Sequence, residues 1–320
     1  MMRKRLSLFV AVLMALSLLL SACGNAAATN ESAETTEGLP MNIMQKSDPA
    51  QDDTINVLMI GNSFCYYYVE ELYGMAKAAG IKMRVCNVYY SGCKVEQHWT
   101  WWKNGESNYS YFTTDENGRK EVKNTNLEYC LSQQNWDVIS LQDASTVLLK
   151  NNITPQEQLT KMTTCLDDLW GYIKRQFPMS RHLWQACWSY QIGYDRGGYA
   201  MKDPQTQAKM CELGQEYGDL VCKAYNLEKV NTGDAWQLVR QDGYDNLCAR
   251  TSVNNGGGDY YHDGDIGGGQ YLNACVWFEV ITGQSGVGNT YRPDYALDTD
   301  ITYEKLQEAA HQAVQNRKVN

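Results

Sequence analysis

Residues 55–69 read INVLMIGNSFCYYYV, and this stretch decides the fold. The short apolar run Ile55–Ile60 contains β-branched residues and predicts a buried strand. Gly61 permits a tight turn where that strand ends. We therefore expect the hydroxyl and the N–H of Ser63 at the carboxyl edge of a parallel sheet and at a helix N-terminus, where developing negative charge is stabilised. A serine that only caps the helix is the alternative.

Strand-like and helix-like segments alternate along the rest of the chain. This alternation predicts a three-layer α/β sandwich with a parallel sheet of about five strands. The further strands are expected at Lys82–Tyr90, Asp137–Leu141, His182–Ala186 and Leu227–Val230. The helices are expected at Tyr66–Ala79, Pro155–Gln176, Asp203–Tyr225, Gln270–Ile281 and Tyr303–Asn316.

One long insertion interrupts this pattern after the second strand. Residues 96–135 are too long for a plain connection and are rich in aromatic residues. Asn117-Gly118 lies between two strand-like runs and predicts a β-hairpin. We expect the aromatic side chains of this insertion to overhang the same edge of the sheet as Ser63.

Composition limits the class of protein and the kinds of partner. The chain has 320 residues, 43% of them hydrophobic, which is enough for one core. Its formal net charge is −9, and no block of Lys and Arg follows residues 3–5, so no nucleic acid partner is expected. The chain has 22 Tyr and 9 Trp against 5 Phe. Such amphipathic rings suit stacking on sugars, although ordinary interior aromatics are the alternative for any single ring.

The N-terminus has the regions of an export signal. Arg3-Lys4-Arg5 precedes the apolar run Leu6–Leu20, and Leu20-Ser21-Ala22-Cys23 resembles the lipobox of bacterial lipoproteins. The resemblance implies a signal peptide at 1–22, a lipid on Cys23 and a flexible tether at 23–53. The chain is then expected to be lipid-anchored and outward-facing on a bacterial cell membrane. An uncleaved anchor is the alternative, but the apolar run is short for the ~20 residues that a span needs.

A serine nucleophile needs a base and a group that orients the base. Of the four histidines, His262 is the candidate base, because Asp259 precedes it by three residues in the glycine-rich segment 254–269. One turn of chain can bring that carboxylate to Nδ1 while Nε2 faces outward. His182 opens an expected strand and is assigned a structural role, and His311 lies in the polar terminal helix and is assigned to the surface. His98 lies among tryptophans, where it could touch substrate, but it has no carboxylate spaced to orient it.

At this point the chain resembles the SGNH (GDSL-type) hydrolases, over roughly residues 55–283. Gly61-Asn62-Ser63 resembles block I, Ser91-Gly92 resembles block II, and Asp259-Tyr260-Tyr261-His262 resembles block V. The departure is block III, where Leu141-Gln142-Asp143-Ala144-Ser145 replaces Gly-x-Asn-Asp. This replacement and the segment 269–283 are similar to a bacterial lipoprotein branch of the superfamily whose activity is not known.

The resemblance implies a flavodoxin-like hydrolase domain at 54–320 and a set of roles. Ser63 is the expected nucleophile, His262 its base and Asp259 the orienting group. The N–H groups of Ser63 and Gly92 and the amide of Gln142 are expected to bind the oxyanion. The residues expected to contact substrate are Asn62, Trp99 and Trp188.

The expected activity is hydrolysis of a carboxylic ester outside the cytoplasm. An acetylated carbohydrate is the favoured substrate, and another small ester is possible. A lipase or thioesterase of the same fold is one alternative, and a glycan-binding lipoprotein without catalysis is the other. No cofactor is expected. Asp263 and Asp265 hint at calcium, but no ligand set with EF-hand spacing follows, so no metal site is predicted.

Overall fold

The computed structural model describes residues 53–196, 199–251, 259–298 and 300–317. By its contacts the chain divides into Met1–Asn42 and Ile43–Asn320, and every described residue belongs to the second unit. The predicted signal peptide, Cys23 and the predicted tether up to residue 52 therefore lie outside the described residues. Within the described part, no helix is long and apolar enough to cross a membrane.

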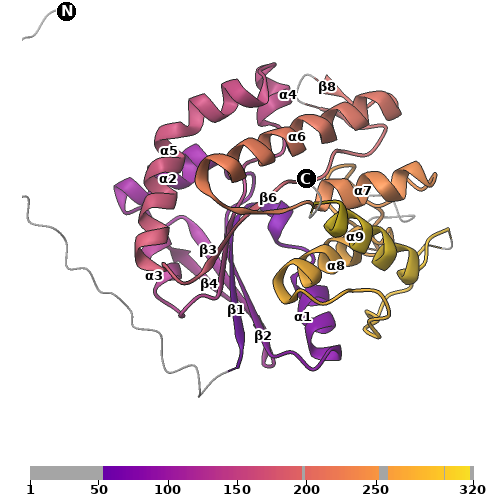
Figure 1. Cartoon of the computed structure of the whole chain (residues 1–320), viewed down its shortest axis with the longest axis horizontal. Helices are drawn as coiled ribbons and strands as arrows, with labels where there is room; N and C mark the ends of the chain where they lie inside the picture. The colour runs from indigo at the N-terminus through magenta and orange to yellow at the C-terminus, as the bar shows by residue number, and fades with distance from the viewer. Residues whose placement is uncertain (1–52, 197–198, 252–258, 299, 318–320) are drawn as a thin grey trace, which may run out of the picture. The chain divides into compact units, whose positions relative to one another are not determined.

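A seven-stranded sheet forms the centre, in the order β4-β3-β2-β1-β5-β6-β9 (Figure 1). The predicted parallel strands are confirmed as β1 (Ile55–Gly61), β2 (Met83–Tyr89), β5 (Val138–Leu141), β6 (Arg181–Gln185) and β9 (Glu228–Val230). The chain places β2 on one side of β1 and β5 on the other. Ser63, which follows β1, therefore lies where the strand order reverses, the place at which open α/β sheets bind their ligands.

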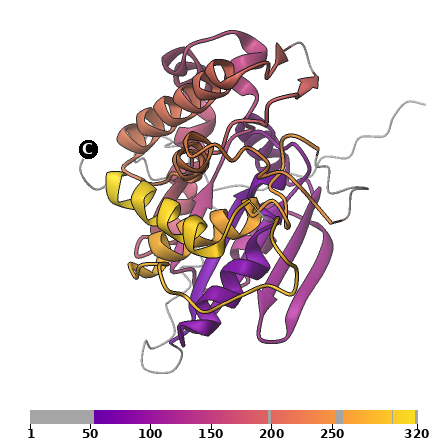
Figure 2. The ribbon, with the colours of Figure 1, turned by 90° about the vertical axis from the view of Figure 1, so that its right-hand side faces the viewer.

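The insertion after β2 contains the predicted hairpin, but in a different setting. Its strands β3 (Tyr109–Asp115) and β4 (Gly118–Thr125) continue the sheet, because β3 pairs antiparallel with β2 (Figure 2). The aromatic run before it forms a helix, α2 (Val95–Asn104), which packs against α5 (Pro155–Gln176). The insertion thus adds two antiparallel strands and a helix to the sheet, whereas we expected a hairpin whose aromatic side chains overhang the edge near Ser63.

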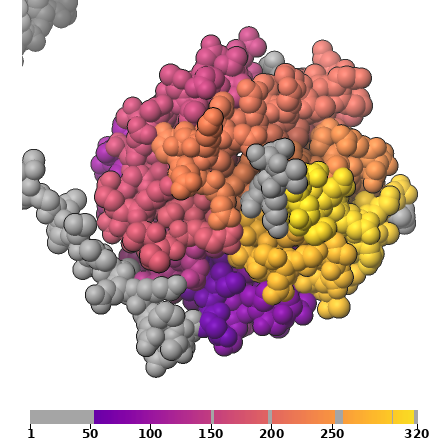
Figure 3. Space-filling view, in the orientation of Figure 1, coloured from indigo at the N-terminus to yellow at the C-terminus, as the bar shows by residue number. Residues whose placement is uncertain are grey.

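Helices cover both faces of the sheet, which confirms the predicted three layers (Figure 1). In the same orientation, the space-filling view shows early residues of the domain, in indigo, beside late residues in yellow (Figure 3). Successive side chains of β1 enter opposite layers: Val57 and Met59 join one apolar cluster, and Leu58 and Ile60 join the other. The first layer contains α1 (Val69–Ala78), α7 (Thr232–Gln241), α8 (Gly269–Thr282) and α9 (Tyr303–Arg317). The second contains α2, α3 (Leu127–Leu131), α5 and part of α6 (Pro204–Tyr225).

Local signals explain the boundaries of the long helices. Thr154 and Glu157 form a capping box ahead of α5, and Pro155 occupies its first turn, as predicted. Helix α8 is apolar all round and is buried on nearly every side, as a core helix must be. The remaining elements are η1 (Ser63–Cys65), α4 (Val147–Asn151), β7 (Asp195–Arg196) and β8 (Tyr199–Ala200).

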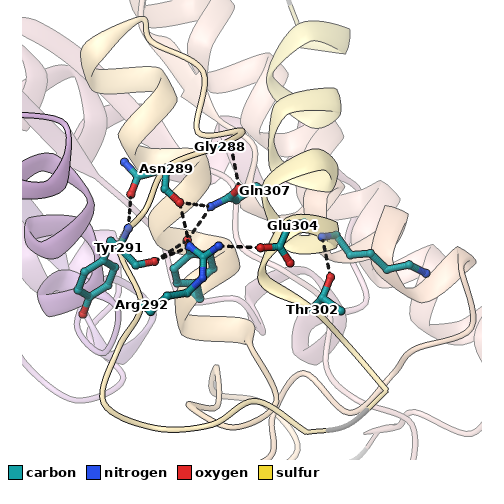
Figure 4. A network of polar contacts seen from close by, with 9 residues as sticks. Gly288, Asn289, Tyr291, Arg292, Thr302, Glu304 and Gln307 are labelled. Carbon is teal, nitrogen blue, oxygen red and sulfur yellow. Dashed lines mark hydrogen bonds and ion pairs between the residues drawn. The ribbon is translucent and has the colours of Figure 1, made fainter.

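The segment between α8 and α9 is fixed by a polar network (Figure 4). Gln307 of α9 accepts a hydrogen bond from the N–H of Gly288 and donates one to the carbonyl of Asn289. Arg292 donates to Glu304 at 2.6 Å. The segment is thereby pinned to α9, and further along it Tyr295 donates its hydroxyl to the buried Glu71 of α1 at 3.0 Å.

Glu71 predicts a pH-dependent contribution to stability. Burial raises the pKa of this carboxyl from 4.5 to about 7, and its Oε2 has no partner among the described residues. Because the folded pKa lies above the unfolded one, the free energy of unfolding falls as pH rises from about 4.5 to about 7. Relative to Glu71→Gln, the wild type should lose on the order of 2–3 kcal/mol between pH 5 and pH 8.

Urea unfolding of both proteins at the two pH values measures this difference. Glu70→Gln is the matched control, because Glu70 is the preceding residue of α1 and its side chain is 61% exposed. That variant should follow the wild type. An equal pH response of wild type and Glu71→Gln would show that Glu71 does not take up the proton.

Candidate active site

Ser63 begins the 3₁₀ turn that follows β1. Asn62 caps this turn, with its Oδ1 accepting the N–H of Phe64 at 3.0 Å. Gly61 is required at the end of the strand, because a Cβ there would lie 2.5 Å from Cγ of Gln142. Cys65, the thiol closest to this serine in the chain, is buried, and burial raises its pKa to about 12. It is therefore a packing residue and not a nucleophile.

Asp259 and His262 form the expected pair. Nδ1 of His262 is hydrogen-bonded to Oδ2 of Asp259, and the backbone N–H of His262 donates to Oδ1 at 2.8 Å. Burial by itself would raise the pKa of Asp259, but the hydrogen bond and charge of His262 outweigh it and hold this pKa at about 2. The carboxylate thus stays ionised and fixes both the turn and the imidazole.

The early serine turn and the late Asp–His pair meet at the same edge of the sheet. The His262 ring lies 5.8 Å from the ring of Phe64 and 5.1 Å from that of Tyr67, measured between centroids. Among the described residues, no hydrogen bond joins Oγ of Ser63 to the imidazole. Such bonds often form only when substrate is bound. The three residues are brought together, and their catalytic roles stay predictions.

Two backbone donors lie beside Ser63. Gly92 follows β2 with φ +66°, and the side chain of Asn62 donates to the carbonyl of its neighbour Cys93 at 2.9 Å. This bond ties the turn after β2 to the turn after β1. Within the described residues, neither the N–H of Ser63 nor that of Gly92 has a protein acceptor. Both groups thus remain available to a developing oxyanion.

Gln142 is hydrogen-bonded to the turn that carries Ser63. Its Nε2 donates to Oδ1 of Asn62 at 2.7 Å, and the side chain is fully buried. Gln142 therefore acts as a positioning residue, which holds Asn62 and through it the turn that carries Gly92, and its role as an oxyanion donor stays a prediction.

This assignment predicts the effect of Gln142→Ala. The change leaves Oδ1 of Asn62 with one donor fewer in a buried site, which should lower the free energy of unfolding by about 1–3 kcal/mol. Hydrolysis of an aryl acetate should fall about 10- to 100-fold as the turn loses its support. Urea unfolding and steady-state kinetics measure the two effects. A loss of activity with unchanged stability would support the donor role.

The three residues expected to contact substrate make contacts within the protein, and their binding role stays a prediction. Asn62 is buried, and its amide is engaged by Cys93, Phe64 and Gln142. Because no polar atom of this side chain is left over, Asn62 is part of the framework of the turn.

Neither tryptophan is placed to touch a ligand at Ser63. Trp99 lies on α2 and donates its Nε1 to Asp168 of α5 at 2.8 Å, so it holds two helices together. Trp188 is 1% exposed, stacks on Phe64 at 4.5 Å and donates its Nε1 to the carbonyl of Tyr261 at 2.9 Å. Trp188 therefore supports both the serine turn and the histidine turn from below, and substrate binding is not supported for either residue.

Arg250 belongs to the site but was not found from the sequence, and Asp263, which the sequence suggested only as a hint of calcium, is its partner. The guanidinium of Arg250 lies 4.2 Å from the centroid of the Tyr67 ring and donates to the carbonyl of Asp263 at 2.8 Å. Burial raises the pKa of the Asp263 carboxyl to about 7, against the opposing effect of Arg250. Arg250 thereby braces the turn that carries His262. No motif marks it, since its role depends on contacts that only the fold creates.

Asp143 is a further buried residue that the sequence left without a role. Its Oδ1 accepts the N–H of Val95, the first residue of α2, at 3.2 Å, and its Oδ2 accepts from Gln158 of α5 at 3.2 Å. The carboxylate thus joins the end of β5 to both helices. No group of three or more His, Cys, Asp or Glu side chains in the described part of the chain is placed to hold a metal.

Comparisons with known proteins found one family and a set of structures. The model of the domain of unknown function DUF4886 matches residues 56–313. The structure of a DUF4886 family protein from Bacteroides uniformis is 27% identical, and the match covers 82% of this chain and 95% of that one with a TM-score of 0.66. No curated protein matches the chain.

The other structural neighbours include SGNH and GDSL-like hydrolases and esterases. A candidate SGNH hydrolase from Slackia heliotrinireducens is 16% identical, with 71% of this chain and 98% of that one covered and a TM-score of 0.45. A family 3 carbohydrate esterase from Clostridium thermocellum is 14% identical, with 72% and 98% covered and a TM-score of 0.43. At these TM-scores the likeness says nothing of the reaction of this chain.

Proposed function

The chain belongs to the DUF4886 family, and on that premise we propose that it is a serine ester hydrolase acting outside the cytoplasm. The observation that supports this proposal is the packing of the His262 ring, which is bonded to Asp259, against Phe64 and Tyr67, which both follow Ser63 closely after β1. A hydroxyl, an imidazole and a carboxylate in this order are the elements of acyl transfer.

The proposed reaction has two halves. Oγ of Ser63 attacks the ester carbonyl while Nε2 of His262 takes its proton, and the N–H groups of Ser63 and Gly92 stabilise the oxyanion. Collapse breaks the bond to the alcohol, which leaves with the proton from His262. Water, deprotonated by the same imidazole, then attacks the acyl-enzyme and releases the acid and the free serine.

The proposed substrate is an O-acetylated carbohydrate. Support comes from the excess of tyrosine and tryptophan over phenylalanine, since amphipathic rings suit the mixed polar and apolar surface of a sugar. Long-chain or thioester substrates are the enzymatic alternative. Acetate release from a panel of acetylated glycans separates these classes.

A fluorophosphonate probe tests the reaction type, because it reacts with an activated serine and needs no knowledge of the substrate. Wild-type protein should be labelled on Ser63, as mapped by peptide mass spectrometry. The second candidate is a glycan-binding protein without catalysis, because the same excess of tyrosine and tryptophan suits a surface that only binds sugars. No labelling together with retention on a polysaccharide column would support that candidate and contradict the enzyme.

We also propose that the protein is anchored by a lipid on Cys23 to the outer face of a bacterial membrane. The support is the sequence of the N-terminal region, with its basic residues, apolar run and lipobox-like Leu20–Cys23. Radiolabelled palmitate incorporated by the wild type and lost in Cys23→Ala tests it. Equal incorporation in both proteins would contradict the anchor.

A further inference from the structure

We propose that Tyr90 and Tyr260 are two aromatic subsites that bind sugar rings on opposite sides of Ser63, so that the site takes an oligosaccharide and not a single sugar. This inference rests on the proposed ester hydrolysis and names the length of its substrate. Both side chains are among the large apolar groups that stay exposed in the described residues, at 42% and 43%. Each lies in a turn that also carries a group of the candidate site.

Tyr90 lies two residues before Gly92. Its ring meets that of Trp101 at 4.8 Å with an interplanar angle of 78°, and Trp101 is braced in turn by Tyr109 at 5.4 Å. In such an edge-to-face pair, one ring presents its edge to the face of the other. Tyr90 therefore keeps at least one ring face clear of Trp101. A fixed ring with an open face beside an oxyanion donor is suited to stacking.

Tyr260 lies between Asp259 and His262 and has a backbone conformation that bulky residues rarely adopt. Its φ is +67°, in the left-handed region, where strain is usually found at functional sites. The ring rests on Gly193, where a Cβ would lie 3.0 Å from Cε1 of Tyr260. The glycine thus leaves room for the ring, and the carbonyl of Tyr260 accepts the N–H of Gln191 at 2.8 Å. The ring is held in place while much of its surface stays open.

The strand order places the two tyrosines on opposite sides of the nucleophile. Tyr90 directly follows β2, whereas Tyr260 is bonded to Gln191, in the segment that follows β6. In the order β2-β1-β5-β6 these strands are three spacings apart, or about 14 Å. That span is wider than one sugar ring. A ligand that touches both tyrosines while its ester lies at Ser63 must therefore contain several linked rings.

The chemistry of the two side chains fits a carbohydrate chain. A tyrosine ring offers an apolar face to the C–H groups of a pyranose and a hydroxyl to its polar rim. Two such platforms separated by a hydrolytic centre bind a chain that passes through the site. A single acyl chain has no rings to stack on them.

Acetate release from acetylated xylo-, manno- and chito-oligosaccharides of one to four units tests the inference. For the wild type, kcat/KM should rise with length, mainly through a lower KM. Tyr90→Ala and Tyr260→Ala should each reduce the ratio of tetramer to monomer kcat/KM by about tenfold. Tyr129→Ala is the matched control, because Tyr129 is 40% exposed but lies on α3, and its ratio should equal that of the wild type.

Calorimetric binding of the acetylated tetramers to Ser63→Ala protein gives a reading that does not need catalysis. Affinity should weaken about tenfold when either tyrosine is replaced in that background. A wild type that hydrolyses p-nitrophenyl acetate but shows no gain with length for any of the three series would overturn the inference and leave the proposed hydrolase standing. A protein that hydrolyses no ester but binds the tetramers through both tyrosines would contradict the proposed hydrolase and leave the two aromatic subsites standing.

Discussion

Ser63→Ala is expected to lower kcat for p-nitrophenyl acetate by roughly 10³- to 10⁶-fold. The physical reason is the position of the hydroxyl. It follows β1 at the reversal of strand order, beside two backbone donors, and across from an imidazole that a carboxylate already orients. No other group of the turn can take over, because Cys65 is a buried thiol whose pKa of about 12 keeps it protonated.

His262→Ala should give a loss of similar size, since a serine without its base is a weak nucleophile. The two losses should not add in the double variant, because both residues serve one step. His311→Ala is the control: its ring contacts Glu279 of α8, on the helical layer and not in the serine turn, so its kcat should match the wild type. Hydrolysis by Ser63→Ala protein at the wild-type rate would refute the nucleophile.

The sequence predicts the parallel part of the fold well because local signals coincide there. An apolar run ending in glycine marks β1, and Pro155 behind a capping threonine marks the start of α5, at the residue where the helix begins. These features depend on a few neighbouring residues. The structure confirms β1 and the start of α5, because contacts elsewhere in the fold do not oppose these local signals.

The sequence predicts only those contacts of the site that join residues close together in the chain. Asp259 and His262 are three apart, so their bond can be anticipated. The burial of Gln142 and the side on which Trp99 packs depend on contacts with residues 80 and 69 positions away. No local pattern specifies such contacts. The same limit hides Arg250, whose partners are a tyrosine far back in the chain and a backbone carbonyl.

In helix α2, tertiary contacts partly bury side chains that the composition suggests are exposed for ligand binding. Its run of tryptophans looks like an exposed aromatic surface, yet Trp99 bonds to α5 and Trp102 packs on Tyr172 at 4.7 Å. Asp143 fixes the start of this helix from the end of β5. The aromatic residues thus stabilise the attachment of the insertion, whereas Tyr90, which directly follows β2, is exposed at the edge of the sheet.

Asp259→Asn should lower kcat about 10⁴-fold while the protein stays folded. In the wild type, the carboxylate accepts the Nδ1 proton of His262 and so leaves Nε2 free to take a proton from Ser63. An asparagine can present its N–H₂ to Nδ1 instead, which favours the tautomer with the proton on Nε2. Because that tautomer cannot act as a base, activity is lost although the geometry is kept.

The pH behaviour separates this role from a purely structural one. The folded pKa of Asp259 is about 2, below its ordinary 3.8, so its contribution to stability is complete above about pH 4 and is lost as pH falls towards 2. In Asp259→Asn, this loss of stability between about pH 4 and pH 2 should be absent. Asp265→Asn is the matched control, since that carboxylate lies on the same segment but bonds to Thr251 and not to the imidazole. If Asp259→Asn and Asp265→Asn reduced kcat equally, Asp259 would act on the loop alone, and the imidazole would need another orienting group.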